Sequence, residues 1–163
     1  MGVHSGLLDV ARNQHRLATV IGHEIGHVLA RHSNERISQQ YAAQTGLALT
    51  QALAGASLGP GTGQALMGLL GLGAEYGILM PFSRTQESEA DFIGLDLMAD
   101  SGFDPRESIT LWQNMSAAGG GSPVEFLSSH PSHGTRIEDL QKRMPHAMAL
   151  WENARNHGYN PEY

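Results

Sequence analysis

The sequence predicts a mainly α-helical fold that carries one minimal β element at its N-terminus and forms a single domain over residues 1–163. Between residues 9 and 29, apolar side chains recur at the spacing of a wide helical face, which is how a helix meets a core. A second helix has clear end signals, because Ser83 with Gln86 three residues later forms a capping box and Gly102 is the expected C-terminal cap. With 40% apolar content, a chain of this length can bury one core.

The other elements follow from breakers and end signals along the chain. Gly6 marks the exit of the N-terminal strand, and Asp104-Pro105 places Pro at the first position of a further helix. The apolar stretch 64–80 is interpreted as a buried hairpin helix, with a membrane-contacting or substrate-contacting segment as the alternative. The expected elements are, in order, a strand over 2–8, a helix from about 9 that continues through 33 to about 53, a glycine-rich loop over 55–63, a helix over 64–80, a helix over 83–101, a helix from 104, a glycine break at 119–121, a loop over 122–135, and closing helices over 136–144 and 145–157.

Composition excludes several classes of protein. The net charge of −6, without a basic stripe, argues against nucleic acid as a partner. The absence of cysteine excludes disulfides and thiolate metal sites. No apolar run reaches the ~18 to 20 residues of a membrane span, and no secretory signal is visible. The abrupt start suggests that targeting information is missing, so this absence says little about the compartment.

The motif His23-Glu24-x-x-His27 is the most informative stretch of the chain. On a helix, residues four apart project from one face, about 40° apart, so both imidazoles can hold one zinc ion. Glu24 lies beside them, where it can act on a water molecule at the metal. Because a zinc hydrolase needs a third protein ligand, and cysteine is absent, that ligand must be a histidine or a carboxylate.

His32 is not expected to be the third ligand. On the helical wheel, His32 lies more than about 100° from both His23 and His27. Nothing between residues 29 and 32 signals a break in the helix. We therefore expect His32 to have a packing role near the site.

Two glutamates of the next informative helix compete for the ligand position. Glu87 and Asp91 share the face that must point inward, whereas Glu89 lies about 200° from Glu87 on a solvated stripe. Two inward carboxylates are costly unless cationic groups meet them. Zinc for Glu87, and the free N–H of a ligand histidine for Asp91, would meet that need. The alternative is a buried salt bridge, for instance to Arg84 or Arg136.

Three ordered motifs carry a resemblance to a known family. The motifs are Gly22-His23-Glu24-Ile25-Gly26-His27, Ser83-Arg84 with Glu87 and Ala90-Asp91, and His130-Pro131-x-x-x-x-Arg136-Ile137. They resemble those of the M48 zinc metallopeptidases, a gluzincin family of the Ste24/HtpX/Oma1 type, and the chain looks most like its bacterial envelope members similar to BepA and LoiP. The match covers roughly residues 2–144.

The resemblance implies a gluzincin-type peptidase core, in which the His-Glu-x-x-His helix packs against the Glu-x-x-x-Asp helix. It implies one Zn²⁺ per chain, bound by His23, His27 and Glu87. His130 is the candidate fourth ligand. In relatives, the corresponding histidine either aids catalysis or caps the zinc in a latent state.

The same resemblance implies roles for the neighbouring residues. Glu24 would be the general base, and Asp91 would orient a ligand histidine. Arg136 would anchor the His130 loop or help to polarise the site, and His133 is read as a surface residue.

The implied function is zinc-dependent hydrolysis of peptide bonds in misfolded or unfolded polypeptides of the bacterial periplasm or membrane-associated envelope. The alternative is a latent, chaperone-like protein-binding module whose zinc is capped by His130. Relatives usually carry strands and a signal or membrane anchor ahead of this region. From their absence we expect weaker substrate binding, membrane proximity only through the missing anchor, and oligomers formed at unpaired strand edges.

Overall fold

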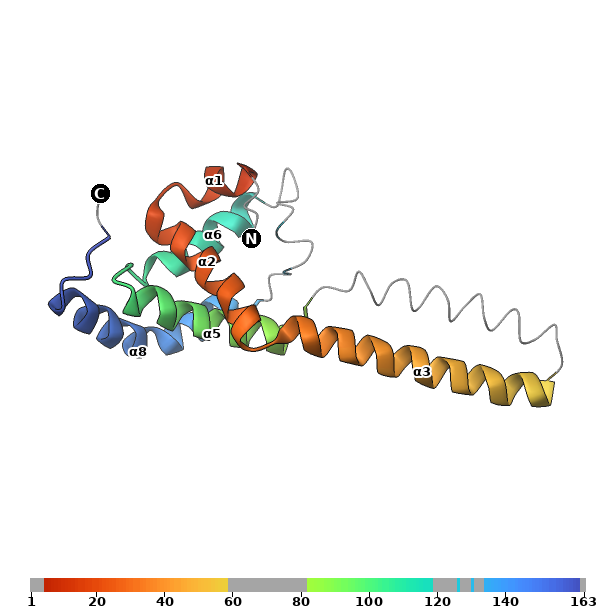
Figure 1. Cartoon of the computed structure of the whole chain (residues 1–163). Helices are drawn as coiled ribbons and strands as arrows, with labels where there is room; N and C mark the ends of the chain where they lie inside the picture. Colours follow the sequence, from red (N-terminus) through yellow and green to blue (C-terminus); the bar gives the residue numbers. More distant parts are fainter. Residues whose placement is uncertain (1–4, 59–81, 119–125, 127–129, 131–133, 162–163) are drawn as a thin grey trace. The chain divides into compact units, whose positions relative to one another are not determined.

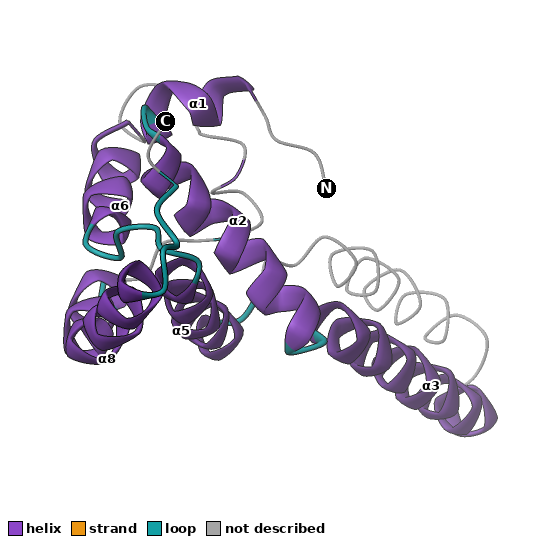
Figure 2. Ribbon diagram, turned by 60° about the vertical axis from the view of Figure 1, so that its left-hand side comes forward, coloured by secondary structure: helices purple, strands orange, loops and turns teal. Residues whose placement is uncertain are grey.

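The computed structural model describes residues 5–58, 82–118, 126, 130 and 134–161. The chain divides into two compact units, residues 31–80 and the remainder. The first unit in chain order holds α1 (Ser5–Ala11), α2 (Gln14–Leu29), α5 (Arg84–Asp100), α6 (Glu107–Ala118) and α8 (Arg136–Asn156). The second unit holds α3 (His32–Leu58). All the described elements are helices, as Figure 2 shows, so the mainly α prediction is confirmed.

The expected N-terminal strand is wrong for the residues that the structure describes. Residues 5–11 form α1, and residues 1–4 lie outside the described part. Leu7, Val10 and Ala11 are buried in the core and lie three and four positions apart, which is the spacing of one helical face. Packing against α6 and α2 therefore selects a helix where the local sequence was read as extended.

The long helix expected after residue 9 is divided by two corners. Arg12 has φ of 60°, and Asn13 then caps α2 by accepting a hydrogen bond from the Arg16 N–H at 2.8 Å. At the other end, α2 stops at Leu29 and Arg31 has φ of 58°. The expectation of an unbroken helix into residue 33 is therefore wrong. Arginine carries no local signal for the left-handed region, so the break could not be read from composition.

The ends of α5 were predicted correctly. The Ser83 side chain accepts from the Gln86 N–H while the Gln86 side chain accepts from the Ser83 N–H, which completes the capping box. Gly102 has φ of 85°, and a Cβ there would lie 2.4 Å from the carbonyl oxygen of Tyr159. Only glycine fits this C-terminal turn.

The two closing helices expected around Pro145 form one helix, α8. Pro145 has no N–H, so the Gln141 carbonyl four residues earlier lacks its usual helical donor. Both residues are exposed, so water can donate a hydrogen bond to that carbonyl. Leu140, Ala147 and Ala154 are buried on both sides of the proline. This continuous buried face keeps the helix intact across it.

The close approach of α2 and α5 is what positions the site (Figure 1). A Cβ on Gly22 would lie 2.7 Å from the Gly94 carbonyl oxygen, and a Cβ on Gly26 would lie 2.6 Å from that of Ala90. Small residues on both helices let the backbones touch. The predicted packing of the His-Glu-x-x-His helix on the Glu-x-x-x-Asp helix is therefore observed.

The apolar face of α2 is only partly buried. Val20 is in the core, whereas Ile25, Val28 and Leu29 are 41%, 74% and 59% exposed. None of the described helices is long and apolar enough to cross a bilayer. The loop expected over 55–63 is wrong for residues 55–58, because α3 continues to Leu58. Several expectations lie outside the described residues: the rest of that loop, the helix over 64–80, the glycine break at 119–121, and the loop over 122–135 apart from a few residues.

Candidate metal centre

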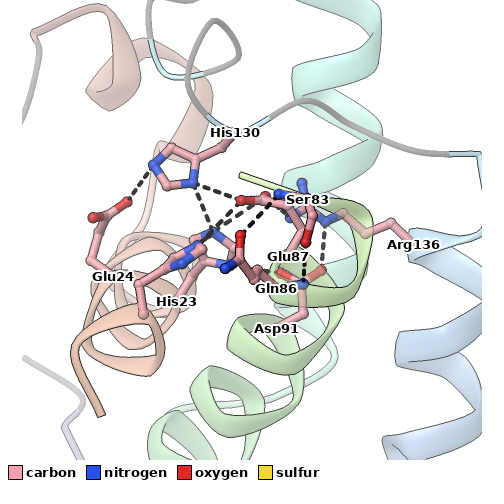
Figure 3. Close-up of polar contacts among 9 residues, drawn as sticks. His23, Glu24, Ser83, Gln86, Glu87, Asp91, His130 and Arg136 are labelled. Carbon is pink, nitrogen blue, oxygen red and sulfur yellow. Dashed lines mark hydrogen bonds and ion pairs between the residues drawn. The ribbon is translucent and has the colours of Figure 1, made fainter. Parts of the chain in front are cut away.

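Four buried side chains bring one ligand atom each to a common point. His23 and His27 come from α2, Glu87 from α5, and His130 from the segment before α8. Figure 3 shows how His23, Glu87 and His130 point towards one another. The four ligand atoms all lie within 4.8 Å of one another. Helical spacing accounts for the first two, and the glycine contact between α2 and α5 brings Glu87 opposite them.

Four of the six distances among these atoms are close to those around a small tetrahedral ion. His23 Nε2 lies 3.1 Å from His27 Nε2 and 3.2 Å from His130 Nδ1. Glu87 Oε1 lies 3.2 Å from His27 Nε2 and 3.1 Å from His130 Nδ1. Tetrahedral zinc with bonds near 2.0–2.1 Å would place its donor atoms about 3.3 Å apart. Three imidazole nitrogens and a carboxylate oxygen also form a donor set that zinc accepts, so these residues fit the metal.

Asp91 orients His23, the first histidine of the group. Its Oδ1 lies 2.8 Å from His23 Nδ1, inside the core. The Nδ1–H therefore donates to Asp91, and the lone pair of His23 Nε2 faces the common point. This is the contact that the sequence analysis expected for Asp91.

Arg136 neutralises both inward carboxylates. Its Nε donates to Asp91 Oδ2 and its Nη2 to Glu87 Oε2, each at 2.5 Å, and the side chain is 2% exposed. The guanidinium carbon lies 3.7 Å from the centroid of the Trp112 ring. Glu87 forms the buried salt bridge to Arg136 that was considered as the alternative, and its other oxygen faces the histidine nitrogens, so the salt bridge leaves that oxygen available to a metal. Arg84, the other suggested partner, is exposed.

Glu24 lies at the outer edge of the group and contacts His130. The distance from His130 Nε2 to Glu24 Oε1 is 3.2 Å, and the Glu24 side chain is 31% exposed. In Figure 3, His130 lies between Glu24 and Glu87. One ring nitrogen of His130 therefore faces the ligand group while the other meets the carboxylate beside it.

Burial and neighbours shift the pKa values of two ligand residues. Burial, together with the nearby His23 and His130, lowers the pKa of His27 although Glu87 acts in the opposite direction. Burial opposes ionisation of Glu87, but hydrogen bonds from His130 and His27 and the charge of Arg136 outweigh it. They hold the pKa of Glu87 well below its usual range. A neutral imidazole and an ionised carboxylate are the protonation states that a metal needs.

Other candidates are not among these four residues. His32 is buried but is not one of the four converging residues, and Glu89 is exposed. His133 lies outside the described residues. Sequence reasoning missed the aromatic rings around the site, Phe82, Trp112 and Phe126, because an isolated aromatic residue has no spacing that ties it to a distant motif.

Comparison with known proteins supplies an independent observation. The model of peptidase family M48 matches residues 1–144. The chain is 40% identical over 154 residues to the mitochondrial metalloendopeptidase OMA1 of Schizosaccharomyces pombe, covering 93% of the chain and 43% of that protein. It is 33% identical over 162 residues to human mitochondrial metalloendopeptidase OMA1, with 93% and 30% covered. It is 31% identical over 145 residues to the beta-barrel assembly-enhancing protease of Escherichia coli, with 86% and 30% covered.

The chain thus spans less than half the length of these relatives. No solved structure matches it.

Proposed function

The chain belongs to peptidase family M48, and on that premise we propose that it is a zinc-dependent endopeptidase. The observation that carries the proposal is the convergence of His23, His27, Glu87 and His130 within 4.8 Å. The relatives whose names include metalloendopeptidase support the reaction class. Because the chain corresponds to only part of those relatives, the activity is assigned to the site and not carried over from a whole protein.

In this proposal, His23, His27 and Glu87 hold one zinc ion per chain. Bound zinc supplies a Lewis acid for the scissile carbonyl and for the attacking water. Glu24 is the general base, taking a proton from the water and passing it to the leaving amine. Its position at the open edge of the group suits that task.

The remaining polar residues keep these groups in place. Asp91 holds the His23 ring so that the lone pair of His23 Nε2 faces the proposed zinc position. Arg136 pairs with both carboxylates and fixes their orientation. An arginine bound to two carboxylates has its charge engaged, so we assign it this anchoring role rather than contact with the substrate.

A second candidate function follows from the position of His130. Its Nδ1 lies among the ligand atoms and its Nε2 contacts Glu24. In this arrangement His130 takes the fourth ligand position and also engages the general base. The chain would then act as a latent, chaperone-like module that binds unfolded polypeptides until His130 leaves the site.

Two substitutions test these proposals in the purified chain loaded with zinc. Glu24→Gln should retain zinc and lower casein cleavage by about 10²- to 10⁴-fold, the usual contribution of a general base. His130→Ala should raise cleavage if His130 caps the zinc, and lower it if His130 assists the reaction. Glu89→Gln, which changes an exposed carboxylate on α5, is the matched control. Cleavage by Glu24→Gln at the wild-type rate would remove Glu24 from the mechanism.

We further propose misfolded or unfolded envelope polypeptides as substrates. The bacterial relatives named beta-barrel assembly-enhancing protease support this class. Relatives named mitochondrial metalloendopeptidase support the same reaction in another compartment. Fractionation of cells that produce the native protein, with immunodetection in each fraction, tests the envelope assignment. Recovery of the protein outside the envelope fractions would refute it.

A further inference from the structure

The imidazole of His130 is packed against two phenylalanine rings. The Phe126 ring is stacked on it, with centroids 4.5 Å apart and planes inclined by 13°. The Phe82 ring is also stacked, at 5.2 Å and 28°. Phe82 immediately precedes the N-cap of α5, whereas Phe126 lies four residues before His130. Two separate segments therefore supply aromatic surface to one histidine, and we call Phe82 and Phe126 the aromatic cradle.

Polar contacts alone leave the His130 ring partly unconstrained. Nδ1 meets His23 and Glu87, and Nε2 meets Glu24, at distances of 3.1–3.2 Å. These contacts act at the edge of the ring and tolerate a tilt about the line that joins the two nitrogens. Stacked rings act on the face, so they restrict that tilt.

The cradle is also tied to its surroundings. The His130 backbone N–H donates to the Phe126 carbonyl at 3.0 Å, and Phe126 is 8% exposed. Phe82 also lies against His27, with centroids 4.0 Å apart. Phe126 meets the edge of the His23 ring at 5.9 Å. The two phenylalanines are thus well placed to orient His130 and not merely to fill space.

We infer that Phe82 and Phe126 are positioning residues that hold His130 Nδ1 in the ligand group. The inference rests on the proposed function in so far as His130 shares the metal site. In this inference, both phenylalanines act through the tilt of the His130 ring. Loosening the cradle should therefore lower the share of chains in which His130 occupies the fourth ligand position.

A double-mutant cycle tests this in the full chain. Phe126→Leu keeps apolar volume but removes the flat face, and it should weaken zinc binding by about 3- to 10-fold, the worth of one aromatic pair. In a His130→Ala background the same substitution should change the zinc Kd by less than about twofold. Competition with a chromophoric chelator measures the Kd. Phe126→Tyr should bind zinc with wild-type affinity, because tyrosine keeps an aromatic ring face against His130.

Phe82→Leu provides an independent cycle at a half-buried position, in case Phe126→Leu does not fold. It should show a larger residual effect in the His130→Ala background, because Phe82 also packs on His27. Phe103→Leu is the matched control, since Phe103 is half-buried and meets the edge of the His15 ring. It should leave zinc affinity unchanged.

Proton NMR of the metal-free chain tests the cradle without reference to zinc. Stacked phenyl rings shield the carbon-bound protons of His130, so their resonances, identified by their loss in His130→Ala, should lie upfield of ordinary histidine positions. Phe126→Leu and Phe82→Leu should each move them downfield, and Phe103→Leu should not. If the wild-type chain binds no zinc, the proposed function fails. This measurement still decides whether Phe82 and Phe126 stack on His130.

Three results would overturn the inference. The first is that the His130 resonances of Phe126→Leu and of Phe82→Leu lie at the same positions as in the wild type. The second is an equal loss of zinc affinity from Phe126→Leu with and without His130. The third is a loss from Phe103→Leu as large as that from Phe126→Leu, which would indicate general packing.

Discussion

Glu87 is the side chain through which most of the metal centre is connected. One oxygen pairs with Arg136 and the other lies 3.1–3.2 Å from nitrogens of His130 and His27. A fully buried carboxylate is tolerated only because cationic or hydrogen-bonding groups surround it. Removing its charge should therefore affect the metal and the core together.

The first prediction compares two glutamates of α5. Glu87→Gln should weaken zinc binding by about 10- to 100-fold or more. The neutral amide lacks the negative charge that attracts the zinc ion and that pairs with Arg136. Glu89→Gln should leave the Kd unchanged, because Glu89 is exposed. Metal analysis after dialysis against a weak chelator measures both. Equal losses from the two variants would contradict the assignment of Glu87 as a ligand.

The second prediction concerns pH in the metal-free chain. The pKa of His27 is lowered from 6.5, so the unfolded chain takes up a proton there before the folded chain does, and stability falls as pH drops below 6.5. The pKa of Glu87 is lowered from 4.5, so its contribution is present above pH 4.5 and is lost below it. Both shifts predict a free energy of unfolding that decreases from pH 7 to pH 4.

Urea unfolding followed by circular dichroism in EDTA measures this free energy at each pH. His27→Asn should flatten the upper part of the decrease, because it removes the group that titrates there. Stability that stays constant or rises between pH 6.5 and 5 in the wild type would contradict the role of His27.

Among the helices, the contact between α2 and α5 determines whether the ligands meet. Gly22 faces the backbone of Gly94, and Gly26 faces the backbone of Ala90. Both approaches are so close that a Cβ on Gly22 or Gly26 would not fit. The ligand histidines follow these two glycines directly in sequence. A wider separation of the helices would therefore move His23 and His27 away from Glu87.

The third prediction is that Gly22→Ala destabilises the chain by about 1–3 kcal/mol, the usual cost of overpacking, despite the better helix propensity of alanine. It should also weaken zinc binding. Gly46→Ala in α3 is the control, because a Cβ there meets nothing within 4 Å. Urea unfolding of both variants measures the difference. A Gly22→Ala variant as stable as the wild type would show that the helices can separate without cost.

For the molecule as a whole, the proposed function couples metal binding to folding. The four candidate ligands come from α2, α5 and the segment before α8, and only the folded chain brings them together. An ion that binds the folded state alone stabilises it by mass action.

The fourth prediction is a change in thermal stability on metal removal. Free zinc at 100 times its Kd should add about 2.7 kcal/mol, which raises the Tm by about 5–10 °C for a chain of this size. EDTA should abolish the increase, and Glu87→Gln should show little of it. Thermal denaturation followed by circular dichroism measures the Tm. An identical Tm with zinc and with EDTA would contradict coupling between the ligand group and the fold.

Local patterns in the sequence were sufficient for much of this picture. The capping box at Ser83 predicted the start of α5, and helical spacing predicted that Glu87 and Asp91 point inward while Glu89 does not. These features depend on residues within one or two turns of one another, so periodicity and hydrogen-bonding chemistry determine them.

Other features were decided only by tertiary structure. Residues 5–11 are helical because Leu7, Val10 and Ala11 are buried together, and α8 runs through Pro145 because its buried face is continuous. The left-handed turn at Arg31 has no local signal. In the first two cases, contacts between distant segments outweigh a local preference of about 1–3 kcal/mol.

By itself, the sequence determined which residue types could form a metal site and which helical faces carry them, because those properties repeat with the helix period. Tertiary structure decided where His130 lies and what surrounds it. Its contacts with Glu24, Glu87, Phe82 and Phe126 join segments up to 106 residues apart, because 130 minus 24 is 106. The packing of α2 against α5 and of α5 against α8 brings distant segments together, because the energy of a contact depends on distance in space and not on separation along the chain.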